Sequence, residues 1–228
     1  MTSMATARFL SGAFLVFMAL ASPLAAQDLT VTTVEDGETE TLYVGRAAMR
    51  YVTESDDIII RLEQKKYILV DHAEKTYSEL TFDQMRKMAA GVGKDLDPKD
   101  KEELSRSLDG GRESTFKRMG PGDTILGYKT EKYLLTGPLG QIEVHAAPSL
   151  ETPAAYFEAI NLNAGGPFAG LTEQFKAIKG MMLKTVSNLK ILGSPIVTTS
   201  VATRVDRSPI PAARFEPPSG YKNVPPEF

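Results

Sequence analysis

Residues 57–80 read DIIIRLEQKKYILVDHAEKTYSEL, and this stretch decides the class of fold. Apolar and polar residues alternate with a period of two in three short runs, which predicts three strands. The polar turns between the runs are short enough only for antiparallel neighbours, so the stretch is a β-meander. Its second strand is apolar on both faces, with Tyr67 and Leu69 on one face and Ile68 and Val70 on the other. We therefore expect a sheet that is covered on both sides or that curls around something.

The rest of the chain continues this pattern of strands and adds a few helices. Further strands are predicted at residues 29–34, 39–44, 47–52, 114–119, 124–128, 131–136, 141–147, 181–186 and 196–205. Helices are predicted at residues 82–91, 97–108, 153–160 and 171–178. The first helix follows Thr81, whose hydroxyl group has capping-box spacing with the amide of Gln84. Consecutive strands joined by short turns are typical of a large antiparallel sheet or a partial barrel.

The first 26 residues are predicted to be a secretory signal peptide. Arg8 is the only charged residue before Asp28, and the apolar run at residues 9–21 is too short to span a membrane. Ala25 and Ala26 supply the small residues that a signal peptidase requires, with cleavage expected after Ala26. The sequence thus predicts a periplasmic or secreted protein.

Residues 27–228 are expected to form a single domain, because they contain neither internal repeats nor a low-complexity linker. Two features stand out within it: a highly charged helical insert at residues 82–108, and a proline-rich carboxy-terminal tail that Phe215 and Tyr221 should pin to the fold. The chain has no cysteine, so neither a disulfide nor a lipid-modified cysteine anchor is possible. Its formal net charge of -3 gives no support to nucleic-acid binding.

The sequence offers little for catalysis or metal binding, and we expect neither an enzyme nor a bound cofactor or metal. Its two histidines, His72 in a turn and His145 on the polar face of a strand, are expected to be solvated because neither has a closely spaced histidine partner. Asp71, His72 and Glu74 leave an envelope hydrolase as a minor alternative. No glycine-serine-glycine nucleophile elbow accompanies them.

Three stretches carry a resemblance to a known family: KTYSEL at residues 75–80, ILGYKTEKY at residues 125–133 and FEPPSGY at residues 215–221. They resemble an uncharacterised family of exported bacterial proteins that is grouped with the LolA-like superfamily, the outer-membrane lipoprotein carriers and their relatives. The resemblance implies an α+β fold in which a curved antiparallel β-sheet, a half-barrel, is covered by a few helices. It also implies an apolar space between sheet and helices that takes up acyl chains.

A cavity of this kind is the candidate site that the sequence predicts. Methionine-rich helices and a sheet that is apolar on both faces can form an adaptable apolar cavity, because thioether side chains repack around varied shapes. The residues expected to line it are Ile68, Val70, Met85, Met88, Met181 and Leu183. An ordinary packed core is the simpler interpretation of the same residues.

The leading hypothesis is therefore a non-enzymatic protein, peripheral to the membrane at most, that binds a lipid or a lipoprotein acyl chain. The alternative is a protein-interaction or sensory module of the cell envelope without a small-molecule ligand. Such a module would use an exposed sheet edge or the charged insert at residues 82–108.

Overall fold

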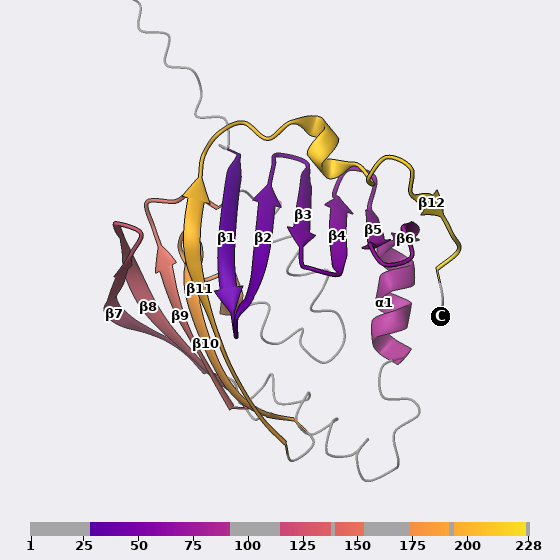
Figure 1. Cartoon of the computed structure of the whole chain (residues 1–228). Helices are drawn as coiled ribbons and strands as arrows, with labels where there is room; N and C mark the ends of the chain where they lie inside the picture. The colour runs from indigo at the N-terminus through magenta and orange to yellow at the C-terminus, as the bar shows by residue number, and fades with distance from the viewer. Residues whose placement is uncertain (1–27, 92–114, 138–139, 153–173, 192–193, 227–228) are drawn as a thin grey trace, which may run out of the picture.

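A computed structural model of the chain describes residues 28–91, 115–137, 140–152, 174–191 and 194–226 (Figure 1). The strands are β1 (Leu29–Glu35), β2 (Glu38–Val44), β3 (Ala48–Val52), β4 (Asp56–Arg61), β5 (Lys66–Asp71), β6 (Thr76–Thr81), β7 (Thr115–Ile125), β8 (Tyr128–Gly137), β9 (Gly140–Ala147), β10 (Met181–Ile191), β11 (Ser194–Asp206) and β12 (Lys222–Asn223). They form one open sheet in the order β12-β6-β5-β4-β3-β2-β1-β11-β10-β9-β8-β7. Every pair is antiparallel except the parallel pair of β12 with β6.

The predicted meander is confirmed, but the predicted α+β class is wrong. The part of the chain that the structure describes is mostly β and contains a single α-helix, α1 (Phe82–Gly91), and a single 3-10 helix, η3 (Ala212–Phe215). The prediction had a half-barrel covered by a few helices, whereas the structure has one open twelve-stranded sheet. The helices predicted at residues 97–108 and 153–160, the first part of that at 171–178 and the predicted signal peptide lie outside the described residues.

Strand β7 illustrates why more of the chain is β than expected. The sequence predicts two separate strands, at residues 114–119 and 124–128, yet β7 passes through Gly120-Pro121-Gly122-Asp123 as one strand of 11 residues. The residues are accommodated by two irregularities in the pairing with β8, between Arg118 and Gly120 and between Pro121 and Thr124. Because β-bulges absorb extra residues without ending a strand, a local turn signal does not by itself stop the sheet.

One face of the sheet, here called the inner face, carries the main hydrophobic core. Directly paired residues of six neighbouring strands form a buried row: Leu29, Val44, Met49, Ile60, Tyr67 and Leu80. None of them is more than 5% exposed, and burying each such side chain contributes roughly 1.5–3 kcal/mol. This row belongs to a larger cluster, the inner core, which also includes Met181 and Leu183.

Helix α1 packs on the inner core through its first turn. The predicted capping box is present, since Gln84 N donates to Thr81 Oγ1 at 3.2 Å and Thr81 N donates to Gln84 Oε1 at 2.8 Å. Phe82 lies against Tyr67 with ring centroids 5.1 Å apart, and Met85 packs against the same core. No helix in the described residues is both long enough and apolar enough to cross a membrane.

The opposite face, the outer face, is covered at one end by the carboxy-terminal segment, residues 207–226. This segment runs from the end of β11 past η3 to β12, which adds to the edge of β6 (Figure 1). Phe215 and Tyr221 pack on a buried cluster of Ile59, Ile68 and Val70, so the predicted pinning of the tail is confirmed. The second apolar face of β5 is thus covered by residues that are distant in sequence.

A polar cluster of Arg50, Asp57, His72 and Tyr221 attaches this segment to the sheet. Arg50 donates through Nε to Asp57 Oδ2 at 3.0 Å, pairs with the same oxygen through Nη2, and donates through Nη1 to the carbonyl oxygen of Arg214 at 2.9 Å. His72 lies 3.2 Å from Asp57 through Nε2 and 2.8 Å from the Tyr221 hydroxyl through Nδ1. The His72 side chain is 29% exposed, so it is partly solvated as predicted, but it also has partners that were not predicted because one of them comes from the far end of the chain.

Candidate functional site on the inner face

The structure does not bring the six predicted cavity residues together. Met181 and Leu183 are each 1% exposed in the inner core, and half-buried Met85 packs against the same core. Ile68 and Val70 instead lie on the outer face, beneath Phe215 and Tyr221. The side chain of Met88, in α1, lies outside what the structure describes. The separation follows from the period of two, because Ile68 and Val70 necessarily point away from Tyr67 and Leu69.

Next to the buried row, the inner face carries a second row of apolar side chains that are only partly buried. Leu42 pairs directly with Tyr51, Tyr51 with Ile58, and Ile58 with Leu69, so four neighbouring strands contribute one side chain each. We call this row the inner stripe. Neighbouring strands lie about 4.8 Å apart, which gives the stripe a length of about 14 Å across the strands.

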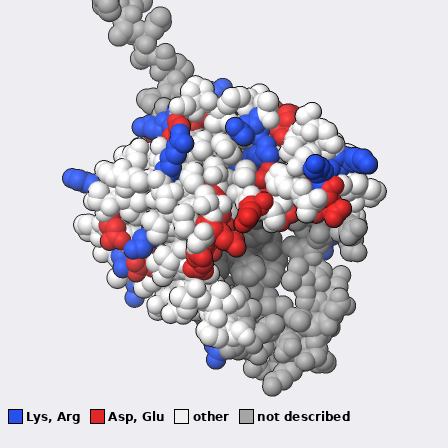
Figure 2. Space-filling model, in the orientation of Figure 1, with Lys and Arg blue, Asp and Glu red and all other residues white. Residues whose placement is uncertain are grey.

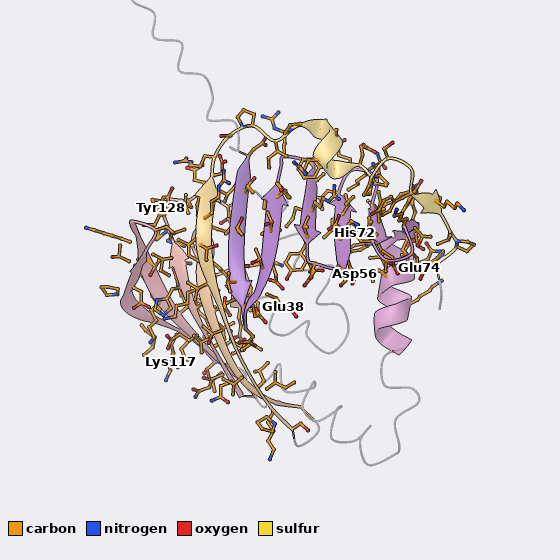
Figure 3. All side chains as sticks on the ribbon, viewed as in Figure 1. Glu38, Asp56, His72, Glu74, Lys117 and Tyr128 are labelled. Atoms are coloured by element: carbon orange, nitrogen blue, oxygen red, sulfur yellow. The ribbon has the colours of Figure 1, made fainter. Side chains whose placement is uncertain are left out.

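A pocket of about 610 Å³ lies at the β4 to β6 end of the stripe. Its apolar lining comes from Ile58, Leu69 and Leu80 of the sheet and from Val224, Pro225 and Pro226 of the carboxy-terminal segment. Asp56, Asp71 and Glu74 line it as well, and Figure 3 shows Asp56 and Glu74 near the end of the sheet that carries α1. Its volume falls within the range of small-molecule sites, and it combines an apolar floor with an acidic rim.

Acidic residues also gather where β1 and β2 meet. Figure 2 shows acidic side chains at the lower end of these strands, and Figure 3 places Glu38 there. Burial raises the pKa of Glu35 above its ordinary value, with further contributions from the charges of Glu40 and Asp36. Burial and a hydrogen bond with Glu40 likewise raise the pKa of the Tyr51 hydroxyl. The inner face thus changes from apolar at the buried row to acidic at this end.

Glu35→Gln is expected to stabilise the protein at neutral pH by a few tenths of a kcal/mol, because the folded state disfavours the charge of Glu35. The pKa of Glu35 in the folded protein lies above the unfolded value near 4.5. The free-energy cost of ionising Glu35 in the folded protein is therefore absent when the pH is well below 4.5 and fully present when the pH is above the folded pKa. The gain should therefore vanish in acid. Thermal unfolding across this pH range measures it, with exposed Glu38→Gln as the control; a variant that is destabilised at neutral pH would contradict the argument.

The second histidine, His145, is not solvated as predicted, being 3% exposed. The bulge of β7 covers it, and Asp123 N donates to His145 Nδ1 at 3.0 Å. Because Nδ1 accepts, the proton of the neutral ring lies on Nε2, which is 2.9 Å from Glu143 Oε1. Lys132 and then His145 lower the pKa of Glu143 by hydrogen bonding. The network is internally satisfied and forms a structural contact between β7 and β9.

A second pocket, of about 690 Å³, lies beside the β7–β8 hairpin. It is lined by Pro121, Tyr128 and Pro148, with Arg118 and Glu131 among its polar residues. These two form an ion pair, which raises the pKa of the Arg118 guanidinium and lowers that of the Glu131 carboxyl group. Their charges are therefore largely satisfied by each other.

The three residues of the hydrolase alternative make separate contacts. Asp71 Oδ1 accepts a hydrogen bond from Glu74 N at 2.8 Å and so caps the turn, whereas His72 contacts Asp57 and Tyr221. Among the residues that the structure describes, no group of three or more histidine, cysteine, aspartate or glutamate side chains is placed to hold a metal ion.

A family model described as "Domain of unknown function (DUF4412)" matches residues 29–221. The chain belongs to this family. The DUF4412 match includes all three stretches on which the resemblance to an uncharacterised family rested, and that part of the prediction is confirmed. No curated protein matches the chain.

Among solved structures, this DUF4412 chain is similar to an uncharacterized conserved protein from Thermus thermophilus, with 10% identity, a TM-score of 0.47, and coverage of 88% of this chain and 91% of that one. A structure of PNGF-II gives 13% identity and a TM-score of 0.45, with coverage of 89% and 31%. MucB gives 12% identity and a TM-score of 0.37, with coverage of 86% and 58%. The chain thus spans about a third of PNGF-II. Similarities this distant do not assign a function.

Proposed function

We propose that this DUF4412 protein is an exported, non-enzymatic binding protein of the periplasm that holds a lipid or lipoprotein acyl chain on the inner face of its sheet, in the manner of a LolA-like carrier. The observation that carries the proposal is the inner stripe. Leu42, Tyr51, Ile58 and Leu69 present a continuous apolar surface that the described part of the fold leaves only partly covered.

The geometry of the stripe suits a long, thin apolar ligand. A row about 14 Å long and one side chain wide, lying across four strands, matches an extended hydrocarbon better than a compact polar molecule. Burying apolar surface contributes about 25 cal/mol per Å², and an acyl chain laid along the stripe would gain this from both partners. Met85, which packs against the same inner core as Leu42, Ile58 and Leu69, adds a side chain that adapts to varied shapes.

The inner stripe ends in the pocket at its β4 to β6 end. Ile58 and Leu69 belong to both features, so a chain lying on the stripe would enter the pocket between the sheet and Pro225 and Pro226. Asp56, Asp71 and Glu74 at the pocket would then lie near one end of the ligand. Export is supported by the charged and apolar regions of residues 1–26, which have the organisation of a signal peptide.

Ile58→Asp is expected to weaken binding of a fluorescent fatty acid by about tenfold or more, because a charge placed in the middle of the stripe opposes apolar contact. Thr39→Asp is the matched control: it adds the same charge to an exposed position of β2 on the outer face. Circular dichroism and thermal unfolding establish that both variants are folded.

Failure of the unaltered protein to bind the fatty acid, or equal binding by the unaltered protein and Ile58→Asp, would contradict the proposal. Native mass spectrometry of the protein from an envelope fraction provides a second readout, in which co-purified lipid is expected. If both experiments give a clean unliganded protein, a protein-interaction role becomes the better account.

A further inference from the structure

The β10–β11 hairpin extends beyond the rest of the sheet. Pairing of β10 with β9 ends at Leu189 and Gly140, and pairing of β11 with β1 ends at Ser200 and Glu35. The two strands nevertheless continue to pair with each other as far as Ile191 and Ser194. Figure 1 shows the hairpin projecting past the lower end of β1 and β2. We call its free part, residues 190–191 and 194–199, the hairpin tip.

The hairpin tip exposes apolar side chains on both of its faces. Ile196 is 40% exposed and Val197 is 61% exposed, and they account for half of the exposed large hydrophobic residues in the described part of the chain. Ile196 pairs with Leu189, so these two share one face, whereas Val197 and Pro195 lie on the other. Solvent-exposed strands usually show apolar residues on one face only.

From this two-sided exposure we infer that the hairpin tip docks the protein on a lipid bilayer, inserting shallowly at the interface between headgroups and acyl chains. A lipid phase surrounds an inserted element and covers both faces, whereas a flat protein surface would cover one and leave the other in water. The depth is limited, because along residues 194–199 the edge of β11 that faces away from β10 has no pairing with β1, and no other described strand lies there. The backbone groups of such an edge remain hydrated at the interface but not in the hydrocarbon core.

The charges around the hairpin tip are compatible with this role. Lys190, exposed at the tip, lies on the same face as Pro195 and Val197 and would meet anionic headgroups. The nearest acidic residue along the sheet, Glu35, pairs with Ser200 and forms a side-chain hydrogen bond with Thr198, so it lies at the base of the tip. The far end of the tip, at Ser194, lies six residues beyond Ser200, which is about 20 Å along the strand. The far end of the tip therefore meets the membrane first, and Glu35 at its base limits how deeply the tip inserts.

The test is co-sedimentation of the purified protein with vesicles of equal parts phosphatidylcholine and phosphatidylglycerol. The unaltered protein should bind, and Val197→Asp should lower its partition coefficient about tenfold, because it replaces an inserted apolar side chain with a charge. Met119→Asp is the matched control, since Met119 is 52% exposed on β7, away from the hairpin tip, and should bind as the unaltered protein does. Lys190→Gln should weaken binding to these vesicles about fivefold and change little on pure phosphatidylcholine.

Three results would overturn the inference: no vesicle binding by the unaltered protein, equal binding by Val197→Asp, or equal losses in Val197→Asp and Met119→Asp. A dimer in solution that Val197→Asp converts to a monomer, without vesicle binding, would assign the tip to a second copy of the chain instead. The inference does not depend on the proposed function. Val197→Asp should keep fatty-acid binding, and Ile58→Asp should keep vesicle binding, so either proposal can fail alone.

Discussion

Arg50→Met is expected to lower the free energy of unfolding by about 3–5 kcal/mol, because it leaves the carboxylate of Asp57 buried without its cationic partner. The Asp57 side chain is 1% exposed, and its Oδ1 has no hydrogen-bond partner, so the pairing through Oδ2 is its main compensation. The variant also removes the bond from Arg50 Nη1 to the Arg214 carbonyl oxygen, which attaches the carboxy-terminal segment.

Chemical denaturation measures this loss, and the double variant Arg50→Met with Asp57→Leu is the control. Replacing both members of a buried ion pair with apolar residues is often close to neutral, so the double variant should recover most of the stability. Limited proteolysis of residues 207–226 should accelerate in the single variant. If the double variant is as unstable as the single one, the cost comes from lost attachment of the segment and not from an unpaired charge.

Gly180→Ala is expected to destabilise the protein by more than about 3 kcal/mol, because it combines an unfavourable backbone conformation with a steric clash. Gly180 has φ +86°, and an added Cβ would overlap the carbonyl oxygen of Ala147 and lie 2.7 Å from Pro148 Cα. Backbone atoms at the end of β9 cannot move aside as a flexible side chain would. The start of β10 therefore has to separate from β9 to accept the new methyl group.

Gly220→Ala isolates the backbone contribution, since Gly220 has nearly the same φ, +85°, and nothing within 4 Å of an added Cβ. This control should lower the free energy of unfolding by about 1–2 kcal/mol, which is the penalty of a left-handed conformation alone. The difference between the two variants in thermal or chemical unfolding then measures the clash at Gly180. Equal losses would show that Gly180 is required only for its conformation.

Much of the fold could be predicted because the alternation that marks a strand involves residues that are close in sequence. The alternation in residues 57–80 correctly placed Tyr67 and Leu69 on one face of β5 and Ile68 and Val70 on the other. The spacing of Thr81 and Gln84 correctly marked the start of α1. In each case the deciding interactions connect residues that are close in sequence.

The errors arose where a distant segment changes the environment of a residue. His145 carries no sequence signal of burial, since its cover is the bulge of β7, 22 residues earlier. The candidate site also depends on contacts between segments that are distant in sequence. Ile58 and Leu69 of the inner stripe follow from periodicity, but their alignment with Leu42 and Tyr51 depends on the registers of separate hairpins. No local sequence pattern around Pro225 and Pro226 predicts that they line a pocket against β5 and β6.

By itself, the sequence determined that this chain forms antiparallel strands, where most of them lie and which side chains share a face, because a period of two is a property of neighbouring residues. Only the tertiary structure decided what covers each face. Arg50 meets the Arg214 carbonyl across 164 residues, and β12 joins the edge of β6 after the whole sheet has been completed. Such contacts depend on the packing of the folded chain, in which shape and burial select among partners that no local pattern distinguishes.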